Sequence, residues 1–369
     1  MNIAMIGHKD FPSRSGGVEV VVYELAVRLA GLGHQVAVYN RGRKKGENHV
    51  RKQGVEVFRC AAPRRSGFNA MVASVTATLM AVPRRYDVIH YHALGPSVML
   101  LLPHLLGVPT VATVHGLDWQ RDKWSRAASA YLKLGERIIA RFADEVIVLS
   151  PEAQGYFRRA YGRETHLIEN AIVPVNPAPC EEIARRFGLE PGGYVFFLAR
   201  IVPEKGLHLL IRAFRQCKTD KKLVIAGHVP EDPYGRQIRE MARGCENILF
   251  TGFVEGTMLR ELYSNCALYV LPSRVEGMAL TLLEAMSAGA RCLTSDIPEN
   301  KDVLGDFGDV FQSGSEQALY EKLSRAMEQP WRNPRAEEQR NYILERCRYD
   351  RMVERTLAVY EKAVRRGRS

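Results

Sequence analysis

The stretch LYVLPSRVEGMALTLLEAMSAGA, residues 268–290, combines the patterns of a strand, a turn and a helix. The apolar run LYVL predicts a buried strand, and residues 279–288, which include few polar side chains, predict a helix. A chain that repeats such units builds a parallel sheet with helices on its faces. The flanking sequence therefore decides whether this stretch belongs to a single α/β unit or to a large α/β protein.

Two glutamates, Glu276 and Glu284, stand eight positions apart in this stretch. In one continuous helix their side chains would point about 80° apart, so a shared helical face explains them poorly. The strand–turn–helix pattern instead places Glu276 in the turn and Glu284 a little more than one turn inside the helix. The unpaired N–H groups of the helix start lie between them and favour an anion. This layout suits a ligand with phosphate in the middle and hydroxyls at both ends, such as a nucleotide sugar.

Strand-like and helix-like segments alternate along the whole chain, and an uncharged, proline-rich segment at residues 170–180 interrupts them. We therefore predict an α/β protein with two Rossmann-like, doubly wound parallel-sheet domains that face each other across a cleft. The predicted domains are residues 1–170 and 171–349, with a C-terminal helix at 350–369 that packs back on the first domain. The predicted strands are residues 3–6, 35–39, 55–58, 87–91, 110–114, 145–149, 166–168, 194–198, 223–226, 248–250, 268–271 and 291–294.

The composition is typical of a globular protein, with 369 residues of which 46% are hydrophobic and 25% are charged. The seven cysteines are scattered and form no C-x-x-C pair, which favours reduced thiols in the cytosol and argues against a zinc site. The opening MNIAMIGHKD lacks a basic segment followed by a long apolar one, so we expect no secretion signal. Two apolar segments, residues 68–82 and 94–108, fall short of the roughly 20 residues of a membrane span. We expect core-packing helices there, with contact at a bilayer surface as the alternative.

The net charge of +11 is concentrated between Arg41 and Arg85. Such a basic region attracts an acidic lipid surface, a pyrophosphate-linked acceptor or nucleic acid, or it is a solvated face without a specific partner. Nucleic acid is disfavoured because no interleaved aromatic residues and no recognised binding motif accompany the charge. The basic residues are Arg41, Arg43, Lys44, Lys45, Arg51, Lys52, Arg59, Arg64, Arg65, Arg84 and Arg85.

Three further segments place candidate binding residues at the ends of predicted strands. Gly16 and Gly17 lie in the turn after the first strand, where the backbone can approach a phosphate. Arg200 ends a strand of the second half and Lys205 lies in the turn that follows, so that two cations can meet a diphosphate. His115 follows a strand of the first half and is expected to face the same crevice. His90 and His92 share a strand face, but no third ligand stands at metal-site spacing, so we predict a metal-free site.

Together these motifs resemble a bacterial family 4 glycosyltransferase, a retaining enzyme with the two-domain GT-B fold, over nearly the whole chain. The motifs that carry the resemblance are the Gly16-Gly17 turn, the VHG around His115, Arg200 with Lys205-Gly206, the TGFV turn at residues 251–254 and the segment EGMALTLLE. The segment HGLDWQRDKW further resembles the branch that builds capsule, exopolysaccharide or O-antigen repeat units. Met278 departs from the bulkier residue common after the Glu-Gly pair, and Asn170 lies in IENAI in place of the usual Asn-Gly-Val/Ile.

The resemblance implies a role for each site residue. Glu276 would bind the hydroxyls of the donor sugar, and His115 would contact the transferred sugar. Glu284 would bind the ribose, and Val254 would line the base pocket. Arg200 and Lys205 would hold the diphosphate, and the leaving phosphate would accept the proton of the acceptor. The residues that would assist them at the donor are Gly16, Gly17, Gly277, Met278, Ala279 and Leu280.

The resemblance implies a retaining transferase that moves a sugar, in the first place a hexose, from UDP to a saccharide or a polyprenyl-pyrophosphate-linked acceptor. Donors based on dTDP-rhamnose or GDP-mannose are the alternatives. We expect no metal or other cofactor, and a cytoplasmic protein that binds the inner face of the plasma membrane peripherally. Three other classes stay open at this point: a nucleotide-sugar epimerase, a non-enzymatic binding module, and a glycosidase, although hydrolysis of a plain glycoside needs no phosphate cradle.

Overall fold

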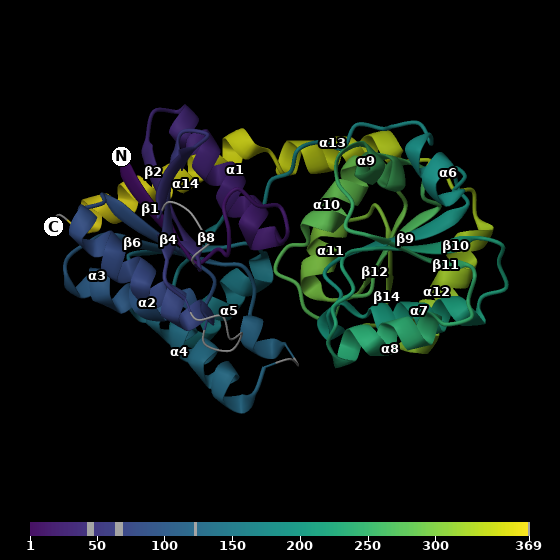
Figure 1. Cartoon of the computed structure of the whole chain (residues 1–369), viewed down its shortest axis with the longest axis horizontal. Coiled ribbons are helices and arrows are strands. Elements are labelled where there is room, and N and C mark those ends of the chain that lie inside the picture. The colour runs from purple at the N-terminus through teal and green to yellow at the C-terminus, as the bar shows by residue number, and fades with distance from the viewer. Residues whose placement is uncertain (43–47, 63–68, 122–123, 368–369) are drawn as a thin grey trace. The chain divides into compact units, whose positions relative to one another are not determined.

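The computed structural model describes residues 1–42, 48–62, 69–121 and 124–367 of the chain. Internal contacts divide the chain into two compact units (Figure 1). Unit 1 contains Met1–Ala171 together with Tyr349–Ser369, and unit 2 contains Ile172–Arg348. The C-terminal segment thus belongs with the N-terminal unit. Each unit is an α/β sandwich and is described by itself.

Unit 1 is built on an eight-stranded sheet in the order β3-β4-β2-β1-β5-β6-β7-β8. All neighbours pair in parallel except β3, which pairs antiparallel with β4 through a tight hairpin. Buried side chains occupy both faces of β1, β5 and β6, as expected for central strands covered by helices on both sides. The strands are β1 Asn2–Ile6, β2 Gln35–Arg41, β3 His49–Lys52, β4 Val55–Cys60, β5 Val88–His92, β6 Thr110–Val114, β7 Glu145–Val148 and β8 His166–Leu167.

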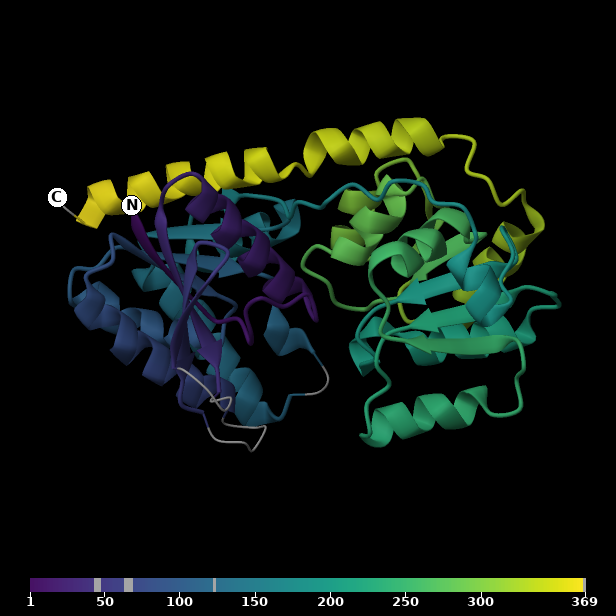
Figure 2. The ribbon, with the colours of Figure 1, turned by 45° about the horizontal axis from the view of Figure 1, so that its top comes forward.

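Two hydrophobic cores hold the helices of unit 1 to this sheet. One core joins the sheet to α1 (Gly17–Gly31) and to the C-terminal helix α14 (Tyr349–Gly367), which runs beside the N-terminus in Figure 2. The other core packs α2 (Asn69–Ala81), α4 (Arg126–Phe142) and α5 (Pro151–Tyr161) on the opposite face. Short turns and helices complete the unit: η1 Val82–Arg84, η2 Pro96–Leu100, α3 Leu101–Leu105 and η3 Asp118–Gln120.

Unit 2 is built on a six-stranded parallel sheet in the order β11-β10-β9-β12-β13-β14. Helices α7, α8 and α12 cover one face through a single core, and α9, α10, α11 and α13 lie on the other face (Figure 1). The strands are β9 Tyr194–Leu198, β10 Lys222–Ala226, β11 Ile248–Gly252, β12 Leu268–Leu271, β13 Cys292–Ser295 and β14 Asp309–Phe311. The helices are α6 Glu182–Phe187, η4 Pro203–Lys205, α7 Leu207–Gln216, α8 Pro233–Ala242, α9 Gly256–Asn265, α10 Leu280–Ser287, α11 Pro298–Leu304, α12 Glu316–Glu328 and α13 Ala336–Arg346.

The predicted fold class is confirmed: the chain has two doubly wound α/β units with Rossmann-like sheets, and every predicted strand overlaps a strand of the structure. The expectation of purely parallel strands is wrong for β3, which the sequence analysis did not predict, and β14 was also missed. The apolar segment around α2 forms a half-buried helix, although Phe68 lies outside the described residues. In the described parts of the chain, no helix has the length and apolar character needed to cross a bilayer.

Candidate functional site

In unit 2 the loops after β9 and β12 meet at the carboxyl ends of these neighbouring strands. The strands pair in parallel, so both loops leave the sheet at the same edge. Gly206, in the first loop, has a positive φ of 70°, and a Cβ atom on it would lie 2.2 Å from the carbonyl oxygen of Pro272 in the second loop. Only glycine allows this close approach. The glycine of the Lys-Gly pair therefore brings the loop that carries Lys205 against the loop that leads to Glu276.

Lys205 and Glu276 form an ion pair at this edge of the sheet. The Nζ atom of Lys205 donates to Oε1 of Glu276, and the two side chains are only 15% and 7% exposed. Charged side chains so far from water persist when they are paired. The structure thus brings together two residues that stand 71 positions apart in the sequence, both of which were predicted for the site. Arg200, the other predicted cation, is exposed directly after β9.

Helix α10 begins immediately after this pair. Its N-cap residue is Ala279, which has no side chain able to cap the first turn. The N–H groups of the first turn consequently keep their partial positive charge, and the helix start favours an anion. Met278 and Ala279 are buried, whereas Gly277 and Leu280 are partly exposed. The predicted donor-binding segment therefore forms the turn between the Lys205–Glu276 pair and a helix start without a side-chain cap.

Glu284 lies one turn into α10 and is held by a tyrosine that the sequence analysis missed. The hydroxyl of Tyr263, on α9, donates to Oε2 of Glu284 over 2.8 Å. Burial, and after it the Glu284 carboxylate, raises the pKa of Tyr263 well above its ordinary value, so the hydroxyl stays protonated and donates. A buried tyrosine needs a partner for its hydroxyl, and this requirement is the one signal that could have pointed to Tyr263.

A layer of buried aromatic rings supports both glutamates from the sheet side. The rings of Phe196, Tyr263 and Tyr269 lie 5.3–6.0 Å apart between centroids. The Tyr269 hydroxyl pairs with Oγ1 of Thr281 in the first turn of α10, at 2.8 Å. Burial raises the pKa of Tyr269 well above its ordinary value, and the nearby carboxylates of Glu276 and Glu284 add to this effect. Both acids therefore lie close to one buried tyrosine at one end of the sheet.

The predicted base pocket follows β11. Val254 is buried, with 6% of its side chain exposed, whereas the neighbouring Phe253 is 60% exposed. An exposed phenylalanine is a large apolar surface next to the strand end, and an aromatic ring can stack on a nucleobase. Phe253 was not among the predicted donor-binding residues.

In unit 1 the corresponding strand ends gather histidines. His8 follows β1, His90 and His92 belong to β5, and His115 follows β6 directly. Gly7 allows these ends to approach, because a Cβ atom on it would lie 2.1 Å from the carbonyl oxygen of His92. Nδ1 of His92 lies 3.1 Å from Nε2 of His115. Burial lowers the pKa of His115 to about 4, so its imidazole is neutral near pH 7.

The predicted phosphate turn at Gly16 and Gly17 lies at the start of α1 in unit 1. Gly16 is the N-cap residue and supplies no capping side chain. The carboxylate of Glu19 lies within 2.4 Å of the place where a Cβ atom of Gly16 would stand, and it accepts a bond from the N–H of Lys9 at 3.3 Å. The first turn of α1 thus already has a carboxylate beside it, which distinguishes this helix start from that of α10.

The loop after His115 is fixed by a buried carboxylate that the sequence analysis also missed. Glu136, on α4, is fully buried and accepts hydrogen bonds from the indole of Trp119, the ammonium of Lys133 and two tyrosine hydroxyls. The Lys133 ammonium also lies 3.4 Å from the centre of the Trp119 ring. Four donors on one buried carboxylate satisfy it and rigidify its neighbours. The HGLDW segment is therefore anchored to α4 by the indole of Trp119.

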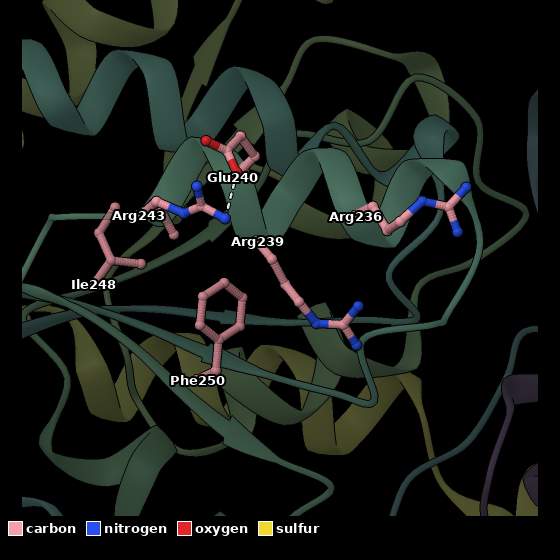
Figure 3. Close-up of a pocket in the computed structure, with 7 residues that line it drawn as sticks. Arg236, Arg239, Glu240, Arg243, Ile248 and Phe250 are labelled. Carbon is pink, nitrogen blue, oxygen red and sulfur yellow. Dashed lines mark ion pairs between the residues drawn. The ribbon is translucent and has the colours of Figure 1, made fainter.

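A hollow of about 540 Å³ lies between α8 and the edge strand β11 of unit 2 (Figure 3). Arg236 and Arg239 on α8 line it together with Arg243, which follows the helix, and no predicted site residue lines it. Arg239 is ion-paired with Glu231 at 2.7 Å, and Arg243 with Glu240 at 2.9 Å. Most of its positive charge is thereby compensated, so this hollow is a poorer anion site than the start of α10.

Among the residues that the structure describes, no three His, Cys, Asp or Glu side chains are grouped so that they could hold a metal ion. The HYH pair does not form such a group, because both ring nitrogens of His90 bond to hydroxyls, those of Tyr360 and Thr113, at 2.7 Å each.

Two family models match the chain in succession. Residues 15–175 match "Glycosyltransferase Family 4", and residues 181–346 match "Glycosyl transferases group 1". The second match contains the Lys205–Glu276 pair and α10, and the first contains the histidine cluster from His90 to His115. An epimerase, a glycosidase and a non-enzymatic binding module are not what these models describe.

Known proteins that resemble the chain agree with these matches. An "Alpha-maltose-1-phosphate synthase" from Mycolicibacterium smegmatis is 26% identical over 98% of this chain and 99% of that protein. The solved sucrose-phosphate synthase from Thermosynechococcus elongatus superposes with a TM-score of 0.86, at 20% identity and 98% coverage of both chains. Anabaena HepE, solved with UDP and glucose, gives a TM-score of 0.81 at 18% identity, covering 98% of this chain and 99% of that one. These matches and the two sheets together identify the chain as a glycosyltransferase of the GT-B fold and the family 4 type.

Proposed function

We propose that the protein transfers a sugar, with retention of its anomeric configuration, from a nucleoside-diphosphate sugar to a saccharide or polyprenyl-pyrophosphate-linked acceptor. The observation that carries this proposal is the arrangement at the carboxyl ends of β9 and β12. There, the Lys205–Glu276 pair stands at a helix start without a side-chain cap, and Glu284 follows one turn later. Ligands of open parallel sheets bind at this end of the strands.

The diphosphate would bind between the cations and the start of α10. Lys205 and the exposed Arg200 supply two positive charges, and the N–H groups near Met278, Ala279 and Leu280 supply the helix dipole. In unit 1, Gly16 and Gly17 would assist with their backbone, although the Glu19 carboxylate beside them weakens that support. The anion thus has its strongest partners in unit 2.

The two glutamates would define the two ends of the donor. Glu276 would accept hydrogen bonds from the sugar hydroxyls while Lys205 turns toward the phosphate. Glu284 would accept from the ribose hydroxyls, and the bond from Tyr263 orients its carboxylate for that contact. Val254 and the exposed Phe253 would border the base. His115 would donate to a hydroxyl of the transferred sugar.

The reaction would form a bond between the acceptor oxygen and the anomeric carbon and break the bond between that carbon and the β-phosphate oxygen. The proton of the acceptor hydroxyl would go to the leaving phosphate, which then needs no protein base. Stabilising the charge on this phosphate is the largest contribution that the protein can make, on the order of 3 kcal/mol for one well-placed donor. The pairing of Glu276 with Lys205 supports a hydrogen-bonding role for this carboxylate.

We propose UDP-hexose as the donor and a reaction that needs no metal. The fold shared with a protein solved with UDP and glucose supports UDP, and dTDP-rhamnose and GDP-mannose remain the alternatives. Lys205, Arg200 and the start of α10 supply positive charge of the kind that a metal ion would provide. These groups support the proposal that the protein itself stabilises the negative charge of the leaving phosphate, without a metal ion.

We also propose a role in cell-surface polysaccharide synthesis at the inner face of the plasma membrane. Two kinds of exposed side chain in unit 1 support it. Leu79 on α2 and Leu105 at the end of α3 are 56% and 71% exposed, and Arg84 and Arg85 follow α2 on the surface. Apolar and basic side chains together favour an anionic bilayer surface. Of the basic residues predicted here, Arg43, Lys44, Lys45, Arg64 and Arg65 lie outside the described residues.

A donor panel tests the proposal. The full-length protein is incubated with UDP-, GDP- and dTDP-sugars, with and without EDTA, and the products are identified by mass spectrometry. We expect slow release of one nucleoside diphosphate, unaffected by EDTA, and an acceptor product whose anomeric proton coupling matches that of the donor. Isomerised donor, or no release from any donor with a range of saccharide and lipid-linked acceptors, would contradict the proposal.

A further inference from the structure

The HYH segment on β5 has a use beyond holding the sheet together. His90 and His92 stand with their ring centroids 4.0 Å apart, and His92 lies against His115, with centroids 5.3 Å apart. Both ring nitrogens of His90 are satisfied by hydroxyls, so His90 has a structural role. His92 differs, because only one of its ring nitrogens has a partner in the described part of the chain.

His92 has no exposed surface, and its environment fixes what its ring can do. Its Nδ1 atom lies 3.1 Å from Nε2 of His115, and its Nε2 atom is buried without a hydrogen-bond partner among the described residues. Burial lowers the pKa of His92 and of His115, so both rings are neutral and each carries one N–H. Two arrangements of these protons are compatible with the contact between the rings.

In the first arrangement, His92 carries its proton on Nδ1 and donates it to Nε2 of His115, and the unpartnered Nε2 of His92 is a bare lone pair. In the second, His115 donates from Nε2 to Nδ1 of His92, and the buried Nε2–H of His92 points at no acceptor. Folded proteins avoid buried N–H groups without an acceptor more strictly than they avoid acceptors with an unused lone pair. The first arrangement is therefore the stable one.

This arrangement determines the proton of His115. Since Nε2 of His115 accepts a hydrogen bond, the proton of the neutral ring must sit on Nδ1. We propose that His92 is a positioning residue that fixes His115 as the Nδ1–H tautomer, so that His115 offers an N–H donor to the substrate at the carboxyl end of β6.

The neighbouring histidine supports the same conclusion. Nδ2 of Asn40 donates to Oδ1 of Asp10 and to the carbonyl oxygen of Phe11, which leaves Oδ1 of Asn40 as an acceptor. Nε2 of His8 lies 2.9 Å from that oxygen and so carries its proton. His8 thus also uses its single N–H in a hydrogen bond and leaves a bare nitrogen buried. The cluster as a whole places its protons where acceptors exist.

The inference has a chemical consequence that rests on the proposed function. An Nδ1–H group donates a hydrogen bond to a sugar hydroxyl oxygen, and it cannot remove a proton through the same nitrogen. A second proton could only enter at Nε2, where it would face the N–H of His92 across 3.1 Å. His115 would therefore bind and orient the sugar as a neutral donor, and the acceptor proton would go elsewhere, to the leaving phosphate.

The tautomer can be measured without any substrate. Ring ¹⁵N–¹H correlation spectra of the full-length, ¹⁵N-histidine-labelled protein at pH 7.5 distinguish protonated from bare ring nitrogens, and the His115→Gln variant assigns the His115 signals by their loss. We expect a protonated Nδ1 and a bare Nε2 on His115. A protonated Nε2 on His115 would overturn the proposal.

Two variants of His92 test whether this residue sets the tautomer. Phenylalanine keeps the ring volume and removes the donor, whereas asparagine has an amide N–H near the position of Nδ1. We expect His92→Phe to move His115 to a mixture of tautomers and His92→Asn to preserve the Nδ1–H form. A His115 spectrum that His92→Phe leaves unchanged would overturn the proposal. His49→Asn is the matched control, because β3 is separated from β5 by three strands.

Transfer activity gives a second readout that separates this inference from the proposed function. We expect His92→Phe to lower kcat/KM roughly tenfold, the loss of about one hydrogen bond, and His92→Asn to restore most of it. Equal loss in both variants would point to a packing role and overturn positioning by the donor. If no sugar is transferred by the wild-type protein while the tautomer is as expected, the proposed function fails and the assignment of His92 stands.

Discussion

Histidine side chains cluster at the strand ends of unit 1, whereas charged side chains lie at the strand ends of unit 2. Both sheets are doubly wound, and both place polar residues after their central strands. In unit 1, burial lowers the pKa of His90 and His115 to about 3 and about 4, and these rings stay neutral. In unit 2, Lys205 and Glu276 are nearly as buried but are held as an ion pair. One architecture thus holds a cluster of neutral imidazoles in unit 1 and a charged Lys–Glu pair in unit 2, and the pairing of the side chains makes the difference.

The largest expected effect on catalysis comes from a change in the Lys205–Glu276 pair. Glu276→Gln keeps the shape of the side chain but removes its charge and one acceptor. We expect kcat/KM to fall at least 100-fold, about 3 kcal/mol of transition-state stabilisation, because the sugar hydroxyls and Lys205 both lose their anionic partner. Steady-state assays with the accepted donor measure this. Glu246→Gln, at an exposed glutamate of the same unit, is the control, and equal activity in the two variants would remove Glu276 from the site.

The neutral His115 should change how the free energy of unfolding depends on pH. The pKa of His115 is about 4 in the folded state, below the ordinary value of 6.5, so the unfolded chain binds more protons between these values. The neutral ring stabilises the fold fully above pH 6.5, and this contribution, on the order of 3 kcal/mol, is lost as the pH falls toward 4. Urea unfolding of the wild-type protein and of His115→Gln at pH 7 and pH 4.5 measures it. The variant should lose less stability with acid, and parallel curves would contradict a partly buried, neutral His115.

A substitution of Lys205 tests where the diphosphate of the donor binds. Lys205→Met removes one charge from the start of α10, and we expect UDP to bind about 30-fold more weakly, or about 2 kcal/mol. Isothermal titration calorimetry measures this affinity. The control is Arg236→Met in the hollow beside α8 (Figure 3), which should leave the affinity unchanged. The reverse result would move the nucleotide site from the strand ends to that hollow.

The smallest expected effect concerns the orientation of Glu284. Tyr263→Phe removes the 2.8 Å bond to its carboxylate, and we expect UDP to bind roughly tenfold more weakly, because one hydrogen bond to a charged group is worth about 1.5 kcal/mol. A UDP analogue without the ribose 2′- and 3′-hydroxyls should bind both proteins equally. Tyr320→Phe, on α12 at the other face of the sheet, is the control. A similar loss for the analogue would show that Tyr263 acts through folding and not through the ribose contact.

The sequence sufficed for most of the fold because its strands are short apolar runs between helical patterns. The sequence did not predict β3, because HVRK contains a single apolar residue. This strand is held by its antiparallel pairing with β4. The sequence also did not predict β14, which has only three residues. Both strands lie at edges of their sheets, where burial leaves little hydrophobic signal in the residues.

The charged residues of the candidate site were predictable because each follows the end of a predicted strand, whereas the side chains that orient them were not. Glu276 and Glu284 belong to one strand–turn–helix unit, so their spacing was informative. Tyr263 and Glu136 contact their partners across separate helices, and the contact between His92 and His115 joins two strands. Buried polar atoms need hydrogen-bond partners, and the partner of each atom can be identified only once the fold is known. The segment that carries the two glutamates thus follows from local sequence, whereas the groups that orient these carboxylates follow from packing.

The central claim is that unit 2 holds the diphosphate of the donor at the carboxyl ends of β9 and β12. A crystal structure of the protein grown with the donor that it hydrolyses most slowly tests this directly. The account predicts phosphate oxygens within hydrogen-bonding distance of Nζ of Lys205 and of the first N–H groups of α10, with the ribose at Glu284. A nucleotide bound along α8, or a Glu276 that still holds Lys205 while the diphosphate binds elsewhere, would contradict it.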